Sequence, residues 1–369
     1  MPIANHISWF ALVTYQRSGA RFPSTFTHYP EFIMDVSKKP QRVYWVDSLR
    51  FIAIFLVYIG HLGPSAGRIY SFVYLFHVPL FFFISGMFYK SGGGIADNVK
   101  SSFKKLMIPY FVYSLASLIV YTLFLQKDIV SVQQYVIQLL EAKRNFTEYA
   151  VQMWFLPCMF LIMIFFHAMK SLIKSDIIVF ALCIVMMSLS VYVPDVPSSV
   201  VPKLPYSLDS AFFYISWYAI GYYCRGWFIS FFSRAGSVQV VMHVLAMAFA
   251  VMCFFGLHHD PENYITLIVG GKTYVILWMI PTFLLFISLI PIAKILSEYQ
   301  PVLYMGRNTL LLCCIESIAK ISFISLIGIS GHSLNIGDEY YSFVYISVLM
   351  LLIYVAKTKL DEWKNKTPV

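Results

Sequence analysis

The residues best suited to chemistry in this 369-residue chain are an arginine and a histidine within one apolar stretch, Arg50 and His61. Eleven positions on an α-helix make about three turns, so both side chains lie on one face, roughly 16 Å apart. Ionisable groups in a membrane segment are costly, and they mark cavities, partners or ion paths. The alternative is an interfacial Arg50 that extends to the headgroups and a hydrogen-bonded core His61.

The elements that must position this pair are membrane helices. Hydrophobic residues make up 59% of the chain and charged residues only 12%, against about 25% charged in soluble domains. Apolar runs of about 20 residues predict an all-α fold, a polytopic bundle of about ten transmembrane helices. We expect these helices at 46–62, 69–89, 107–125, 151–169, 177–193, 208–228, 238–257, 273–293, 303–327 and 340–356.

The basic residues between these spans favour one orientation. Most Lys and Arg fall on segments that share a side with the N-terminus, so both termini are predicted to be cytoplasmic. This bias accounts for the formal net charge of +9, and no nucleic-acid partner is needed to explain it. The six cysteines lack metal-ligand spacing and are interpreted as packing residues, so no metal site is predicted.

The chain is expected to comprise three parts. Residues 1–43 lack the long apolar centre of a signal peptide and are predicted to be a disordered cytoplasmic segment, with Met34 as an alternative translation start. Residues 44–356 form the membrane domain, and 357–369 a basic cytoplasmic tail. Because no segment between the spans is long enough for a soluble domain, chemistry must take place in a cavity between helices.

The second expected span carries a polar string within apolar residues. His77 either donates to a carbonyl left free by Pro79, which has no N–H, or contacts the substrates directly. Ser85 beside Gly86 favours close helix packing over a nucleophilic serine. The string reads Phe76-His77-Val78-Pro79-Leu80-Phe81-Phe82-Phe83-Ile84-Ser85-Gly86, and Lys100, Lys104, Lys105 and Pro109-Tyr110 follow it.

These motifs, taken together, resemble those of acyltransferase family three, the integral membrane O-acyltransferases, and in particular its fucose and polysaccharide O-acetylase branch. The resemblance covers about residues 44–356. It rests on Asp47-x-Leu49-Arg50 and His61, on the string at 76–86, on Lys104-Lys105, on Trp154-Phe155-Leu156 and on Gly306-Arg307-Asn308-Thr309-Leu310. It implies acetyl-CoA as donor, a cell-surface glycan or its lipid-linked precursor as acceptor, a lipid-embedded domain and location in the bacterial inner membrane.

The residue types fit that chemistry. A hydroxyl needs a base to attack a thioester, and a free imidazole, with a pKa of about 6.5, suits that task. His61 is the candidate base. The phosphates of acyl-CoA need cations, which Arg50 and an inner loop with Lys100, Lys104 and Lys105 would supply. Asp47, one turn before Arg50, either orients the guanidinium or caps the helix.

Three further residues are candidates for contact with the substrates or for support of the site: Ser85, Trp154 and Glu316. Glu316 stands where members of the family often carry a histidine. It either pairs with Lys320 four residues later or lines the acceptor cavity.

Three classes of function fit the sequence. The first is a membrane O-acetyltransferase with its donor on the cytoplasmic side and its acceptor on the outer side. The second is a transporter or flippase for a glycan or lipid precursor. The third is a non-catalytic scaffold of a polysaccharide assembly complex.

Overall fold

The computed structural model describes residues 42–90, 92–125, 132–190, 204–256, 279–329 and 339–366. The expectations for the N-terminal segment, including the start at Met34, and for residues 367–369 lie outside these ranges. The described residues contain helices and turns and no strand, as the all-α prediction requires.

The first half of the fold contains helices of very different length. They are α2 (Tyr44–Gly60), the 3₁₀ turn η1 (Gly63–Ala66), α3 (Arg68–Tyr74), α4 (His77–Met87), α5 (Ile95–Ser102), the π-helical turn η2 (Phe103–Met107), α6 (Ile108–Leu125), α7 (Val132–Glu141), the 3₁₀ turn η3 (Val151–Trp154), α8 (Phe155–Leu172) and α9 (Asp176–Ser190).

The second half is dominated by longer helices. They are the 3₁₀ turn η4 (Pro205–Ser207), α10 (Leu208–Ser233), α11 (Ser237–Gly256), α13 (Met279–Leu296), α14 (Gln300–Arg307), α15 (Thr309–Ile329) and α16 (Glu339–Lys366).

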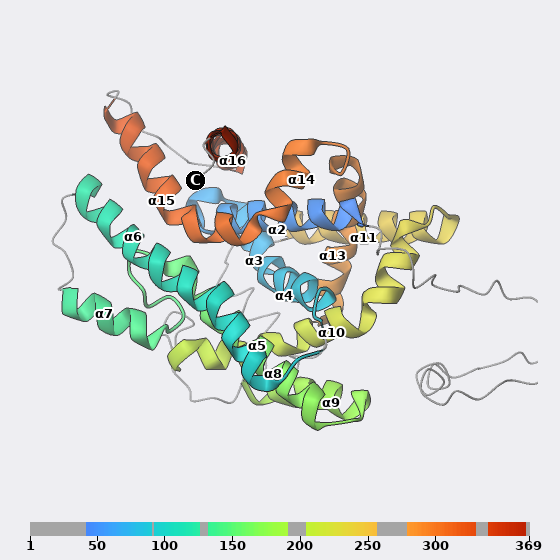
Figure 1. Cartoon of the computed structure of the whole chain (residues 1–369). Helices are drawn as coiled ribbons and strands as arrows, with labels where there is room; N and C mark the ends of the chain where they lie inside the picture. Colours follow the sequence, from blue (N-terminus) through green and yellow to red (C-terminus); the bar gives the residue numbers. More distant parts are fainter. Residues whose placement is uncertain are drawn as a thin grey trace, which may run out of the picture. The chain divides into compact units, whose positions relative to one another are not determined.

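Helix α2, which carries Arg50, lies at the centre of the packing. It contacts α3, α4, α13, α14, α15 and α16, and Figure 1 shows it surrounded by these elements. Leu49, Ala53 and Ile54 of α2 are fully buried or nearly so. Arg50 lies on this helix and His61 is its C-cap residue, so the helices that pack on α2 surround both candidate catalytic residues.

Glycines allow two pairs of helices to cross at very short distance. A Cβ atom on Gly86 of α4 would lie 1.9 Å from the carbonyl oxygen of Tyr218 in α10. A Cβ atom on Gly306 of α14 would lie 2.0 Å from the carbonyl oxygen of Asp47 in α2. Small residues at such crossings are typical of helix packing in membranes. The packing role predicted for the Ser85-Gly86 step is therefore confirmed for Gly86.

Seven of the helical segments in the described part of the chain are long and apolar enough to cross a membrane. They are Arg68–Met87, Ile95–Leu123, Val151–Leu172, Ser237–Gly256, Met279–Leu296, Thr309–Gly328 and Glu339–Trp363. Three of the expected spans correspond to helices outside this set. Helix α2 has 17 residues and α9 has 15, and α10 is long but rich in Tyr and Trp. The count of ten and the orientation stay predictions.

Helix boundaries differ from the expected spans at two places. Lys100, Lys104 and Lys105 were expected in a loop, but α5, η2 and α6 run on as one helical segment. The prediction of a loop is wrong, because residues 95–108 contain no glycine or proline to end the helix. The expected span at 303–327 is broken at Asn308, between α14 and α15.

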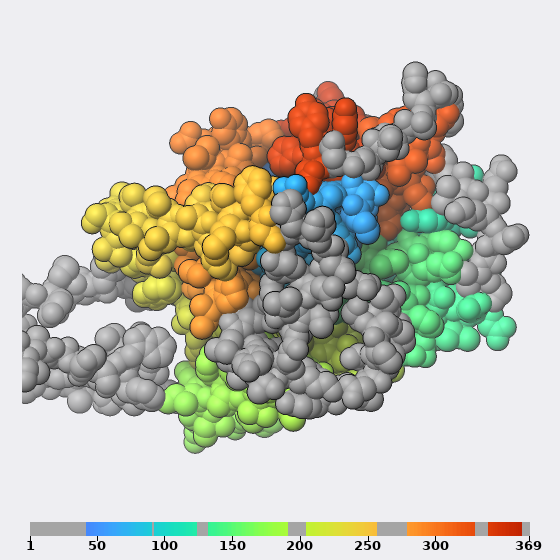
Figure 2. All heavy atoms as spheres, turned by 180° about the vertical axis from the view of Figure 1, so that it is seen from behind, coloured from blue at the N-terminus to red at the C-terminus, as the bar shows by residue number. Residues whose placement is uncertain are grey.

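Helix α11 exposes apolar side chains along its length. On α11, Val238, Val244, Leu245 and Met252 are each at least 60% exposed. Figure 2 shows α11, in yellow, on the outside of this face. An apolar surface of this kind on a long helix is what a lipid environment requires. Together with the seven long apolar helices, this surface indicates a multi-pass membrane protein.

Candidate active site

A cavity of about 1060 Å³ lies between the helices, and Arg50 and His61 both line it. Its wall between these two residues includes Ile54 and Val57 of α2, and α4 contributes His77, Phe81 and Ser85. Arg50 and His61 thus face the same cavity, as their predicted position on one helix face requires. Both side chains are therefore accessible from the cavity, and His61 is in addition hydrogen-bonded to Glu316.

Several cations line the same cavity as Arg50. The Arg50 guanidinium stacks on the ring of Phe88, 4.0 Å from its centroid. Lys90, Lys104 and Lys105 line the cavity too, whereas Lys100 is exposed and is not part of its wall. Two of the three candidate lysines thus reach the cavity, and Lys90 was not among the candidates; their role in binding the donor stays a prediction. Three lysines and an arginine in one cavity suit a ligand with several phosphates.

The π-helical turn η2 explains why two consecutive lysines reach this cavity. Pro109 has no N–H to donate to the carbonyl of Lys105, so an ordinary α-helical bond cannot form there. A π-helical turn of this kind is a common feature of functional sites. Widening the helix at residues 103–107 turns Lys104 and Lys105 toward the cavity in spite of their adjacency.

Asp47 is a buried partner of two arginines. Its carboxylate lies 3.7 Å from Arg50 Nη1 and 3.5 Å from Arg307 Nε, and the residue is 3% exposed. The N-cap of α2 is Val43, and no side chain caps that helix end. Of the two roles predicted for Asp47, helix capping is wrong, and the ion pair with Arg50 is the contact that orientation of the guanidinium requires. Arg307 belongs to the Gly-Arg-Asn motif, which the sequence had left without a role.

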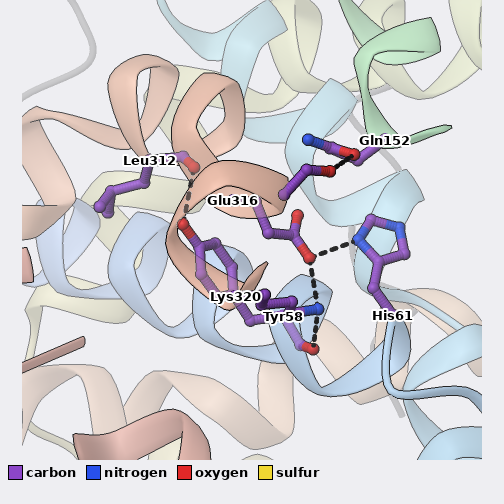
Figure 3. A network of polar contacts seen from close by, with 7 residues as sticks. Tyr58, His61, Gln152, Leu312, Glu316 and Lys320 are labelled. Atoms are coloured by element: carbon purple, nitrogen blue, oxygen red, sulfur yellow. Dashed lines mark hydrogen bonds and ion pairs between the residues drawn. The ribbon is translucent and has the colours of Figure 1, made fainter. Parts of the chain in front are cut away.

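His61 forms a dyad with Glu316, as Figure 3 shows. His61 Nδ1 lies 2.7 Å from Glu316 Oε1, and the same oxygen accepts a hydrogen bond from Lys320 Nζ at 2.7 Å. Lys320 Nζ also donates to the carbonyl of Tyr58 at 3.1 Å. Because a carboxylate accepts, Nδ1 is the donor in this tautomer and Nε2 keeps its lone pair for a proton.

Glu316 acts behind the cavity wall. It is 1% exposed and is not part of the cavity wall, so the alternative in which Glu316 lines the acceptor cavity is wrong. The predicted ion pair with Lys320 is confirmed. A buried carboxylate that holds a histidine in one tautomer and orientation is the arrangement found in acid–base catalysis. In this position Glu316 therefore holds the imidazole of His61 in place.

His77 lies beside the dyad. Its Nδ1 donates to the carbonyl of Val73 at 2.6 Å, and the residue is 3% exposed and lines the cavity. The predicted bond to a backbone carbonyl is confirmed, but the carbonyl freed by Pro79 belongs to Leu75 and accepts from Thr282 Oγ1 at 3.2 Å. With Nδ1 occupied, Nε2 of His77 is left for the cavity as a neutral acceptor.

Arg144, Gln152 and Trp154 complete the wall near the two histidines. The Arg144 guanidinium stacks on the Trp154 ring, 4.7 Å from its centroid, and all three side chains line the cavity. Gln152 Oε1 accepts from Ser317 Oγ at 2.6 Å, and Ser317 follows Glu316 in α15. Ser85 also lines the cavity. Trp154 and Ser85 were expected at the site, whereas Arg144 and Gln152 were missed.

Tyr89 gives the cavity a neutral hydroxyl. It lies just beyond the Arg68–Met87 span, and its hydroxyl is 2.9 Å from His167 Nδ1. Burial, together with the neighbouring Tyr222, raises the pKa of Tyr89 to about 12. The phenol is therefore protonated at neutral pH and is a hydrogen-bonding group, not a base.

Comparison with family models places this cavity in a known class. Residues 43–356 match the model of an acyltransferase domain, that of acyltransferase family 3. The chain belongs to acyltransferase family 3. The match includes α2, α4, η3, α14 and α15, so every element of the dyad and of the cation cluster of this acyltransferase lies within it. A search of curated proteins found no match, and a search of solved structures found none.

The residues that were missed share one property. Lys90, Arg144, Gln152 and Arg307 lie in short segments of the chain that reach the cavity or its support from outside the two motif-bearing helices α2 and α4. No spacing within one helix identifies them, because their partners lie on other elements. For Arg307 the Gly-Arg-Asn motif was a usable signal, and for Gln152 the adjacent Trp-Phe-Leu motif was one.

Proposed function

We propose that this family 3 acyltransferase is an acetyl-CoA-dependent O-acetyltransferase that acts on a hydroxyl of a cell-surface glycan or its lipid-linked precursor. The observation that carries the proposal is the dyad. His61, with Nδ1 held by Glu316, lines the same cavity as Arg50, Lys90, Lys104 and Lys105. One cavity thus combines a base with a cluster of cations, as transfer from a phosphate-bearing thioester requires.

The donor occupies the cation cluster in this mechanism. Arg50, held by Asp47, and the three lysines bind the phosphates of acetyl-CoA, and the pantetheine arm follows the wall formed by Ile54, Val57 and Phe81. The distance from Arg50 to His61, roughly 16 Å along α2, is of the order of that arm. The thioester then lies next to His61. With the predicted orientation, the donor enters from the cytoplasmic side.

His61 is the general base of the transfer. Its Nε2 takes the proton of the acceptor hydroxyl while the oxygen attacks the thioester carbonyl carbon, and Glu316 stabilises the imidazolium that forms. The tetrahedral intermediate collapses as the C–S bond breaks. The departing thiolate takes the proton from His61, which leaves an acetyl ester and free CoA.

The acceptor enters at the other end of the cavity, next to Arg144 and Trp154. An aromatic ring with a guanidinium stacked on it presents both an apolar face and hydrogen-bond donors, which suits a sugar. His77 Nε2 is an acceptor available for a second hydroxyl there. In the predicted orientation this end faces the outer side of the membrane.

The test is acetyl incorporation by isolated membranes. Membranes from cells that express the protein are incubated with radiolabelled acetyl-CoA, and label in the glycan and glycolipid fractions is measured. His61→Ala is expected to lower incorporation at least about 10³-fold while the protein stays in the membrane. Incorporation that depends on the protein but survives His61→Ala would contradict the mechanism. Absence of any label with the unaltered protein would contradict the function.

A further inference from the structure

Gln152 is a polar cavity residue that has no role in the proposed transfer. It lies in the 3₁₀ turn η3, is 5% exposed and lines the cavity. Its Nε2 has no hydrogen-bond partner among the described residues. A buried amide that bonds through one side only is rare in folded proteins, because the unpaired N–H has lost its water.

The orientation of this amide is fixed by the helix that carries Glu316. Ser317 Oγ donates to Gln152 Oε1 at 2.6 Å, so Oε1 faces α15 and Nε2 is turned away from that bond. Ser317 is the next residue after Glu316, whose Oε1 holds His61. Gln152 and His61 are therefore both anchored to the same turn of α15, as Figure 3 shows.

We propose that Gln152 is a further catalytic residue, whose Nε2–H group stabilises the oxyanion of the tetrahedral intermediate in the acetyl transfer. The inference rests on the proposed function. Attack by the acceptor oxygen moves the π electrons of the thioester carbonyl onto its oxygen, and the hydroxyl proton goes to His61 Nε2. The oxyanion accepts a hydrogen bond from Gln152 until the C–S bond breaks and the carbonyl re-forms.

The neighbourhood favours a negative charge at this point. Arg144 stacks on Trp154, two residues after Gln152, and its guanidinium lines the same cavity. No carboxylate lines the cavity among the residues that the structure describes, because Asp47 and Glu316 lie behind its wall. A fixed donor in such surroundings stabilises charge that develops in the transition state at no cost in reorganisation.

Gln152→Glu is the sharpest variant. The new carboxylate keeps the shape and can still accept from Ser317, so only the donor is lost and a negative charge is placed where the oxyanion forms. Gln152→Met removes the hydrogen bonds without adding a charge. In membranes with radiolabelled acetyl-CoA, both variants are expected to lower kcat about 10²–10³-fold, with KM for acetyl-CoA unchanged. Ser317→Ala, which frees the amide to rotate, should give a smaller loss of the same kind.

Thermal unfolding in detergent, with and without acetyl-CoA, shows that each variant folds and binds the donor as the unaltered protein does. The inference is overturned if either Gln152 variant that binds donor keeps kcat within about threefold, or if KM rises in place of the fall in kcat. If a Gln152 variant keeps its activity while His61→Ala is inactive in the same assay, the role of Gln152 is refuted and the proposed function stands. If the unaltered protein transfers no label, the proposed function fails as well.

Discussion

Replacement of Glu316 by glutamine tests the dyad most directly. The change keeps the size of the side chain and leaves an oxygen that can accept from His61 Nδ1, but it removes the negative charge. Glu316 Oε1 lies 2.7 Å from His61 Nδ1. With the charges about 4 Å apart and an effective dielectric constant of about 20, the attraction between carboxylate and imidazolium is about 4 kcal/mol.

That attraction acts only when His61 carries the proton, and hence in the transition state. At 1.36 kcal/mol per tenfold in rate, 4 kcal/mol corresponds to about 10³ in kcat. We expect a loss of about 10²–10³-fold for Glu316→Gln, since the amide retains part of the hydrogen bond, with KM for acetyl-CoA unchanged. The assay is the initial rate of acetyl incorporation, normalised to the protein in the membrane.

Lys320 requires a control, because Glu316→Gln also leaves its ammonium without a counter-charge. The Lys320 side chain is 14% exposed, and apart from Glu316 its ammonium contacts the carbonyl and the ring of Tyr58. The pair of changes Glu316→Gln and Lys320→Met removes both charges and should restore the unfolding temperature without restoring activity. Activity of Glu316→Gln within about threefold of the unaltered protein, with His61→Ala inactive, would refute the dyad.

Two further predictions concern the donor site and the helix crossing. Lys104→Gln combined with Lys105→Gln should raise KM for acetyl-CoA about 5–30-fold with kcat unchanged, whereas Lys100→Gln, outside the cavity wall, should leave KM unchanged. A KM that responds equally to Lys100→Gln would mean that surface charge alone attracts the donor. Gly86→Ala should destabilise the fold by about 3 kcal/mol or more, because its Cβ would lie 1.9 Å from a carbonyl of α10. Gly226→Ala, whose Cβ meets nothing within 4 Å, is the control, and equal unfolding temperatures would contradict the close crossing.

The sequence determined the class of fold and those residues of the site that lie close together in the chain. Long apolar runs fix an all-helical membrane protein, because a lipid-exposed backbone must satisfy its own hydrogen bonds. The eleven-residue spacing placed Arg50 and His61 on one face, since helix periodicity is a local property. The motifs at 47–61 and 76–86 pointed to the family that the model of residues 43–356 then established.

Only the tertiary structure decided which groups meet that face. Glu316 is 255 positions from His61 in the chain, and its local spacing to Lys320 predicted an ion pair but gave no indication of a histidine partner. The same holds for Gln152, whose partner Ser317 lies 165 positions away. Spacing reports which residues share a helix face, whereas the contacts between faces depend on how the helices cross. Those crossings are set by packing details such as the backbone contacts of Gly86 and Gly306.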